Sequence, residues 1–231
     1  MVMFSGGVCS WAAAKRVVER HGKENTTLLF ADTKMEDDDL YRFLAEAAAN
    51  VGSPLVIIQD GRNPWEVMKD QRIIANSRID PCSKILKREL LNKWRDSNCD
   101  PAESTVYLGL AWDEIHRLDR LLLRCIPWKY QAPMTEKPLM SKPEMFEWLK
   151  REGIELPRLY KLGFPHNNCG GFCVKAGQAQ FALLLRTIPE RYRWHEEQEQ
   201  ELRKIVGDHS ILRSRVGGGS SPLTLKEFRE Q

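Results

Sequence analysis

The first half of the chain alternates short apolar runs with Ala-rich amphipathic stretches, a pattern typical of a parallel sheet wrapped by helices. The strands are predicted at residues 2–4, 26–31, 54–59, 105–110 and 128–132, and the helices at residues 11–19, 40–51 and 83–94. Because crossovers between parallel strands are right-handed, we expect an α/β fold with a Rossmann-like, doubly wound parallel sheet. In such a sheet, ligands bind at the carboxyl ends of the strands.

The second half of the chain follows a helical pattern instead. Helices are predicted at residues 142–152, 178–187 and 189–206. A loop at residues 165–177 precedes the second of these helices, and the glycine- and serine-rich run 216–222 is expected to be a flexible break. We therefore expect a sheet domain over residues 1–135 and a C-terminal extension over residues 136–231, made of a cysteine-containing loop and helices.

Composition and charge narrow the class of protein. Of the 231 residues, 42% are hydrophobic and 29% are charged, which is ordinary globular usage and argues against a disordered chain. There is no apolar run near the roughly 20 residues that a membrane span needs, and the N-terminus has no secretory pattern. The net charge of +3 is too small to establish a nucleic-acid partner. We expect a soluble, cytoplasmic protein with no membrane partner.

A glycine-containing turn between the first strand and the first helix carries the strongest chemical signal. It consists of Ser5, Gly6, Gly7, Val8, Cys9 and Ser10. Two glycines let the backbone approach an anion closely, and the amides at a helix N-terminus point toward it. The alternative is a plain glycine turn with Ser10 as the N-cap. The motif matches neither the Walker pattern nor the dinucleotide fingerprint, but its position directly after a strand favours a phosphate site.

A basic segment follows Cys82. Pro81 and Ser83 mark a helix start, and Lys84 then shares a helical face with Lys87 or Arg88. Basic neighbours lower the pKa of a cysteine and make it a better ligand or nucleophile. The alternative is a solvated basic face, and the residues alone leave both interpretations open.

The chain has six cysteines, and two of them lie four positions apart around a Gly-Gly turn, Cys169 and Cys173. Two such thiols can converge on one metal, with Cys82 as a third ligand. His166 offers a fourth ligand if the metal is a structural zinc, and two buried thiols remain the alternative without metal. Cys99 and Cys125 are predicted to be core residues.

A polar segment also follows the fourth predicted strand, over residues 109–117. Polar groups at the carboxyl end of a strand lie where ligands bind in this architecture. Arg117 is the candidate phosphate-neutralising cation of this segment. An ordinary charged loop leading into a helix is the alternative.

Together these motifs resemble those of a known family. The Ser-Gly-Gly-x-x-Ser turn is similar to the pyrophosphate loop (PP-loop) of the adenine nucleotide alpha hydrolase superfamily. The sequence Ala31-Asp32-Thr33 resembles the phosphoadenosine phosphosulfate (PAPS) reductase branch, as do Cys82 to Lys87 and the stretch from Pro138 through Tyr160 to Cys173. The resemblance covers residues 1–176.

The resemblance implies an enzyme that binds ATP or a related adenine nucleotide in the domain formed by residues 1–135. Residues 5–10 would hold the phosphates, with magnesium as a candidate companion ion, and Asp32 would lie beside the nucleotide. Cys82, Lys87 and Arg117 are the implied catalytic residues. The family also implies sulfur chemistry and a 4Fe–4S cluster, here with Cys82, Cys169 and Cys173 as ligands; zinc is the alternative metal.

The chain departs from the reductases of this family in three places. Ser83 replaces the second cysteine of a Cys-Cys pair, the later cysteines have three intervening residues instead of two, and no cysteine follows Cys173. Three cysteine ligands leave one iron open, as in related enzymes that thiolate tRNA with ATP and sulfide; DNA phosphorothioation proteins are a further related group.

We therefore expect nucleotide-dependent sulfur transfer to a nucleic acid or a small acceptor. The expected partners are an adenine nucleotide, tRNA or DNA, a sulfur-donor protein and further copies of the chain in a homo-oligomer. The alternatives are a sulfonucleotide reductase that uses an external thiol, and an inactive nucleotide- or nucleic-acid-binding module with a structural zinc.

Overall fold

A five-stranded parallel sheet forms the centre of the computed structural model, which describes residues 1–215 and 219–231. Its strand order is β3-β2-β1-β4-β5. The strands are β1 (Val2–Met3), β2 (Leu28–Asp32), β3 (Leu55–Gln59), β4 (Thr105–Leu108) and β5 (Lys129–Gln131). Val2 is paired with Leu28 on one side and with Tyr107 on the other, so β1 is the central strand. The chain order reverses beside β1, where a doubly wound sheet binds its ligands.

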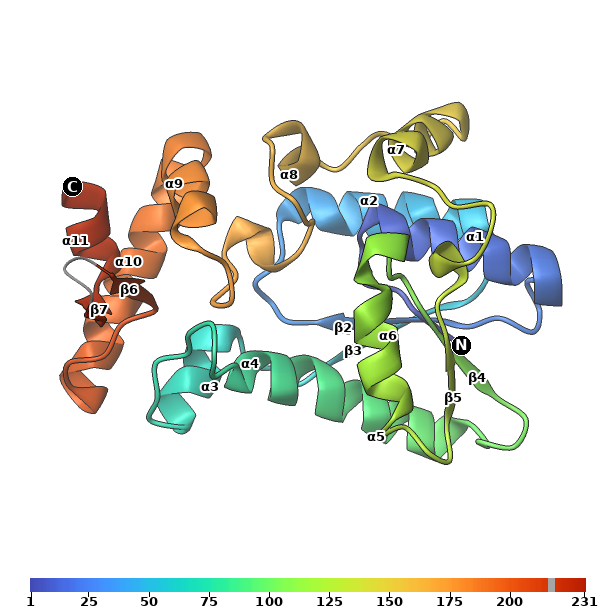
Figure 1. The fold of residues 1–231 in the computed structure, drawn as a ribbon, viewed down its shortest axis with the longest axis horizontal. Helices are drawn as coiled ribbons and strands as arrows, with labels where there is room; N and C mark the ends of the chain where they lie inside the picture. Colours follow the sequence, from blue (N-terminus) through green and yellow to red (C-terminus); the bar gives the residue numbers. More distant parts are fainter. Residues whose placement is uncertain (216–218) are drawn as a thin grey trace.

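Helices cover both faces of the sheet, as Figure 1 shows. On one face lie α1 (Val8–His21) and α2 (Asp38–Val51), and on the other lies α5 (Leu90–Asn98). α7 (Lys142–Arg151) packs on the outside of α1, where the Trp11 and Trp148 ring centroids are 4.8 Å apart. The predicted α/β fold with a doubly wound parallel sheet is confirmed. α1 is buried along the alanines at positions 12–14, whose small side chains let the helix approach the sheet closely.

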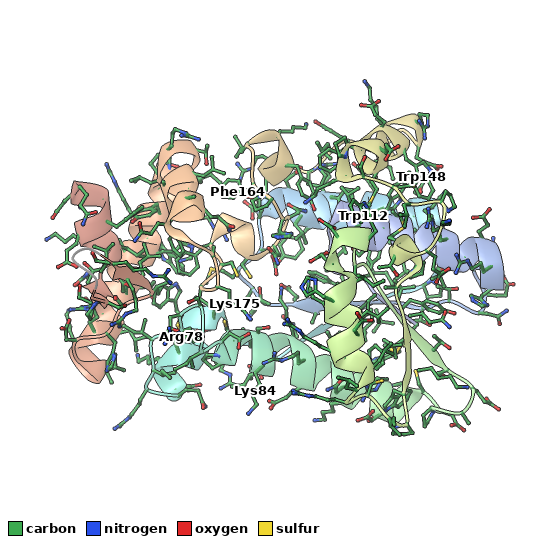
Figure 2. All side chains as sticks on the ribbon, viewed as in Figure 1. Arg78, Lys84, Trp112, Trp148, Phe164 and Lys175 are labelled. Atoms are coloured by element: carbon green, nitrogen blue, oxygen red, sulfur yellow. The ribbon has the colours of Figure 1, made fainter. Side chains whose placement is uncertain are left out.

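The segment between β3 and β4 is more complex than the single helix predicted over residues 83–94. It contains α3 (Pro64–Asp70), α4 (Pro81–Ser83), the π-helix η1 (Lys84–Glu89) and α5. π-helical turns occur frequently at functional sites. Of the predicted face, Lys84 and Arg88 are both exposed, whereas Lys87 lies apart from them, because the wider π turn separates residues three positions apart. Lys84 lies at the surface in Figure 2 and pairs with Glu89, whereas Lys87 pairs with the buried Glu36.

The C-terminal helices form a second packing unit (Figure 1). The bounds predicted for α9 (Gln178–Thr187) and α10 (Pro189–Val206) are confirmed. The predicted flexible break at residues 216–222 is wrong at its C-terminal end, where Ser221 and Pro222 pair with β6; residues 216–218 lie outside the described part. The elements that the sequence did not predict are α3, η2 (Trp112–Glu114), α6 (Ile115–Leu122), η3 (Pro133–Thr135), α8 (Arg158–Lys161), η4 (Cys169–Gly171), β6 (Leu212–Ser214), β7 (Ser221–Leu223) and α11 (Leu225–Glu230).

Helix α10 organises this second unit through one buried face. The Glu199 carboxylate is fully buried and accepts hydrogen bonds from the backbone amides of Ile211, at 3.0 Å, and Leu225, at 2.6 Å. Tyr192 donates to the Leu225 carbonyl at 2.8 Å. The remaining faces of α10 are mostly polar. Across residues 1–215 and 219–231, no helix combines the length and apolar character that a membrane crossing requires.

His195 of α10 joins this unit to the cysteine loop. Its ring stacks on Phe172 with centroids 3.5 Å apart, and its Nδ1 accepts a hydrogen bond from Trp65 Nε1 at 2.9 Å. Burial lowers the pKa of His195 well below its usual range, and the nearby Arg191 adds to this effect. Protonation would place a donor on Nδ1 facing the Trp65 donor. The folded protein therefore requires a neutral His195.

This environment predicts a loss of stability in mild acid. A histidine with a depressed pKa in the folded state contributes stability that is complete above the unfolded pKa of about 6.5 and is lost as the pH falls below it. We expect the free energy of unfolding to fall by roughly 1.4 kcal/mol per pH unit through this window. Urea unfolding at about pH 7.5 and about pH 5.5 measures it. His195→Gln should flatten the dependence, whereas the exposed His116→Gln should leave it unchanged.

Candidate functional site

The turn from β1 into α1 has the backbone geometry of an anion-binding loop. Gly6 adopts φ +73°, which favours glycine, and Gly7 is the N-cap of α1. Ser10 is buried, and its hydroxyl donates to the Gly7 carbonyl at 2.8 Å. The hydroxyl of the exposed Ser5 lies 3.3 Å from the Ser10 hydroxyl. Ser10 therefore shapes the turn from within, and the helix N-terminus offers its amides.

Two residues from the C-terminal half, Tyr160 and Asn167, lie against this turn. Burial raises the pKa of Tyr160 to about 12, against the smaller opposing effect of the Val8 and Asn167 backbone amides, so the hydroxyl stays neutral. Asn167 is buried and its Nδ2 donates to the Gly6 carbonyl at 2.8 Å. The Asn167 Oδ1 is buried without a hydrogen-bond partner. Sequence reasoning missed Asn167; its place beside Cys169 was the one available signal.

A glycine outside the turn, Gly109, allows the first turn of α1 to pack closely against the end of β4. Gly109 follows β4, and a Cβ on this residue would lie 2.5 Å from the Cα of Ser10. Such a distance is far below van der Waals contact, and the obstacle is backbone that cannot rotate away. Gly109 thus fixes how closely β4 approaches the first turn of α1.

A large cavity opens at the carboxyl ends of the central strands. Its volume is about 1070 Å³, and Met3, Thr33 and Leu108 form its inner wall. The predicted site residues that line it are Cys82, Lys87, Arg117, Cys169 and Cys173. Residues 5–10 and Asp32 lie outside its wall. The fold therefore brings three separate sequence motifs together around one space, with the glycine turn next to it.

Asp32 forms its hydrogen bonds with residues close to it in the sequence. Its Oδ1 accepts a hydrogen bond from the Tyr41 hydroxyl at 2.8 Å and another from the Lys34 amide at 2.8 Å. Burial raises the pKa of Tyr41, and the Asp32 hydrogen bond adds to the effect. These contacts hold the carboxylate at the end of β2, beside the cavity-lining Thr33.

The cavity wall is strongly basic. Its one acidic side chain is Asp80, and its basic residues are Lys87, Arg88, Arg95, Arg117, Arg124 and Lys175. Arg95 lies over the Trp128 ring, 4.2 Å from the centroid, and pairs with Asp96. Arg117 is exposed and pairs with Glu114. Arg88 and Lys175 both pair with Asp80. The cations on the wall still outnumber its acidic side chain, and an excess of one sign of charge favours a ligand of the opposite sign.

Cys169 and Cys173 are connected by a turn whose backbone is partly left-handed. Cys169 and the two following glycines adopt φ values of +50°, +56° and +84°. A hydrogen bond between the thiols raises the pKa of Cys169 well above its usual range and lowers that of Cys173 to about 6. Burial raises the pKa of Cys82.

No group of three or more His, Cys, Asp or Glu side chains in the described ranges is arranged to hold a metal ion. Cys82, Cys169 and Cys173 nevertheless share one cavity, and three thiols are the donor set that soft metals and iron–sulfur clusters take. His166, the candidate zinc ligand, is an exposed residue on the same wall. The cysteines thus have suitable chemistry without a preformed metal geometry.

Two cysteines predicted to be core residues are not buried. Cys99 and Cys125 are both partly exposed. Cys125 follows α6, a helix with no buried residue, and lines the cavity. For Cys125 the prediction is wrong because the segment after α6 lines the cavity. Cys99 follows α5 and is half-buried, with its Sγ 3.8 Å from Met1 Sδ.

Gly109→Ala tests the close approach of β4 to α1. Overpacking of this kind costs typically about 1–3 kcal/mol, and we expect that loss in the free energy of unfolding measured with urea. Gly177→Ala is the matched control, because no atom lies within 4 Å of its added Cβ. Equal stability of the two variants would contradict the prediction.

Similar solved structures share little sequence identity with this chain. Neither a family model nor a curated protein matches the chain. Similar solved structures include PAPS reductase from Candida auris in its phosphate complex, with 14% identity, a TM-score of 0.49, and coverage of 71% of this chain and 78% of that one. They also include the NH3-dependent NAD synthetase from Campylobacter jejuni subsp. jejuni NCTC 11168 in complex with nitrate, with 14% identity, a TM-score of 0.43, and coverage of 89% and 82%. At this identity, function must be argued from the chain's own residues.

Proposed function

We propose that the chain is a PAPS reductase-like enzyme of the PP-loop ATP pyrophosphatase class, which binds ATP or a related adenine nucleotide and acts in sulfur transfer. One observation carries the proposal. A glycine turn at the N-terminus of α1, directly after the central strand, lies next to a cavity lined by six basic residues and one acidic residue. A helix N-terminus and a basic wall together suit a polyphosphate.

In this proposal, the amides of residues 5–10 bind the phosphates, and Lys87 and Arg117 neutralise their charge from the cavity wall. Burial acts to lower the pKa of Lys87, but the carboxylate of Glu36 outweighs it and raises that pKa above its usual value. Lys87 therefore remains cationic. Asp32 lies beside the nucleotide, and Mg²⁺ accompanies the phosphates as it does in other nucleotide sites.

The proposed reaction has two displacements. An oxygen of the acceptor attacks the α-phosphorus of ATP, and pyrophosphate leaves. Hydrosulfide from a sulfur donor then attacks the carbon bearing the adenylated oxygen, AMP leaves with that oxygen, and the proton of hydrosulfide passes to solvent. The basic wall that holds the triphosphate also favours a polyanionic acceptor such as tRNA or DNA.

We propose further that Cys82, Cys169 and Cys173 bind a 4Fe–4S cluster at the cavity wall. Their thiolates suit iron–sulfur clusters and zinc alike, and the family that the motifs resemble favours iron. When bound, a cluster with three cysteine ligands supplies an open iron for sulfur. The protein's own contribution is the left-handed turn at Cys169, which brings its thiol to that of Cys173.

Isothermal titration with ATP, AMP and PAPS tests the nucleotide site. We expect Lys87→Met to weaken ATP binding about tenfold, which corresponds to about 1.4 kcal/mol, because it removes a cation from the cavity wall. Ser10→Ala should weaken binding as well, since Ser10 shapes the turn. Lys84→Met is the matched control, because Lys84 lies on the same helix but is exposed and paired with Glu89.

Product analysis separates the proposed enzyme from its alternatives. Pyrophosphate and AMP from ATP, with sulfide present, support sulfur transfer, and salt-sensitive stimulation by tRNA or DNA identifies the acceptor class. Sulfite released from PAPS with an external thiol would point to a reductase instead. Wild-type protein that binds no adenine nucleotide would rule out the proposal.

Anaerobic purification followed by metal analysis tests the metal. We expect iron and sulfide with a broad absorbance near roughly 400 nm, typical of thiolate-ligated clusters. Cys173→Ser should lose most of the bound iron, whereas Cys99→Ser, which does not line the cavity, should retain it. Stoichiometric zinc without that absorbance would instead indicate a structural site that includes His166.

A further inference from the structure

Glu36 is a buried carboxylate that the proposed mechanism uses only to keep Lys87 cationic. It follows β2 in the connection to α2, and 5% of the residue is exposed. Its Oε1 accepts a hydrogen bond from the Thr33 hydroxyl at 2.9 Å and lies 3.4 Å from Lys87 Nζ. Its Oε2 accepts a hydrogen bond from the backbone amide of Cys169. Every oxygen of this side chain therefore has a specific partner.

These partners belong to three segments that are far apart in the sequence. Thr33 directly follows β2, Lys87 lies in the π-helix that follows Cys82, and Cys169 begins the Gly-Gly turn. All three line the cavity. One carboxylate thus connects the strand end, the inward-facing cation and the cysteine loop.

The backbone of Glu36 is itself held by the second packing unit. Arg191 of α10 donates from Nη2 to the carbonyl of Glu36 at 3.2 Å and also to that of Met35. The same guanidinium packs against Gly170, where an added Cβ would lie 1.9 Å from Nη2. The position of Glu36 is therefore fixed from both sides, by its side-chain partners and by Arg191.

We propose that Glu36 is a positioning residue that couples Lys87 to the cysteine loop, holding the cation at the cavity wall and the Cys169 backbone in its left-handed turn. The coupling to nucleotide binding rests on the proposed function, in which Lys87 contacts phosphate. Glu36 itself repels an anion, so its contribution comes through the groups that it orients.

Glu36→Gln separates this role from general stability. Glutamine has one carbonyl oxygen, so it cannot accept from Cys169 and also pair with Lys87. Asp37→Asn is the matched control. Asp37 is fully buried, adjacent in the chain and ion-paired, but its side-chain partners are Arg158 and the Asp39 amide, away from Lys87 and the cysteines.

Three measurements on the full chain test the proposal. Hydrogen exchange of the Cys169 amide should accelerate about tenfold in Glu36→Gln and stay unchanged in Asp37→Asn, a scale set by one lost hydrogen bond. ATP affinity should stay equal or increase in Glu36→Gln, because Lys87 is released, while pyrophosphate release should fall at least about tenfold. In a Lys87→Met background, Glu36→Gln should no longer lower pyrophosphate release, because the cation that Glu36 positions is absent.

Unchanged Cys169 exchange and unchanged turnover in Glu36→Gln would overturn the proposal. So would equal effects of Glu36→Gln and Asp37→Asn on both readouts, since that would indicate only a loss of stability. If the wild type binds no nucleotide, the proposed function fails, and the exchange comparison still decides whether Glu36 holds the cysteine loop.

Discussion

The tight turn from β1 into α1 is the constraint on which the rest of the site depends. β1 is central and pairs with strands on both sides, so the chain can leave it only over the carboxyl edge of the sheet. Gly6 makes the turn in a left-handed conformation, and Gly109 leaves room for it against β4. A helix then starts with its amides directed toward that edge. The location of the anion site follows from these backbone requirements.

Residues far along the chain complete the site. Tyr160 and Asn167 lie against the glycine turn, and Arg191 holds the segment after β2. The second packing unit therefore supports the cysteine loop and the sheet edge at once. Its buried His195 and Glu199 satisfy polar groups within the unit, which fixes α10 and with it the position of Arg191.

Charge is distributed unevenly around the cavity. Basic side chains predominate on its wall, whereas the carboxylates of Glu36 and Asp37 are buried behind it and pair with cations. A buried carboxylate needs partners because desolvation of an unpaired charge is costly. Pairing Glu36 with Lys87 meets that need and holds a cation where an anionic ligand would bind.

The sequence by itself determined the α/β sheet, the bounds of α9 and α10 and the position of the glycine turn, because these depend on local periodicity and on glycine conformation. It also identified the cysteines and Lys87 that line the cavity. It did not predict the π-helix at Lys87, since a wider helical turn leaves no periodic signal, nor the C-terminal ribbon, whose strands are three residues each. Only the tertiary structure revealed the roles of Glu36, Asn167 and Arg191, because each has a partner more than 50 residues away in the sequence.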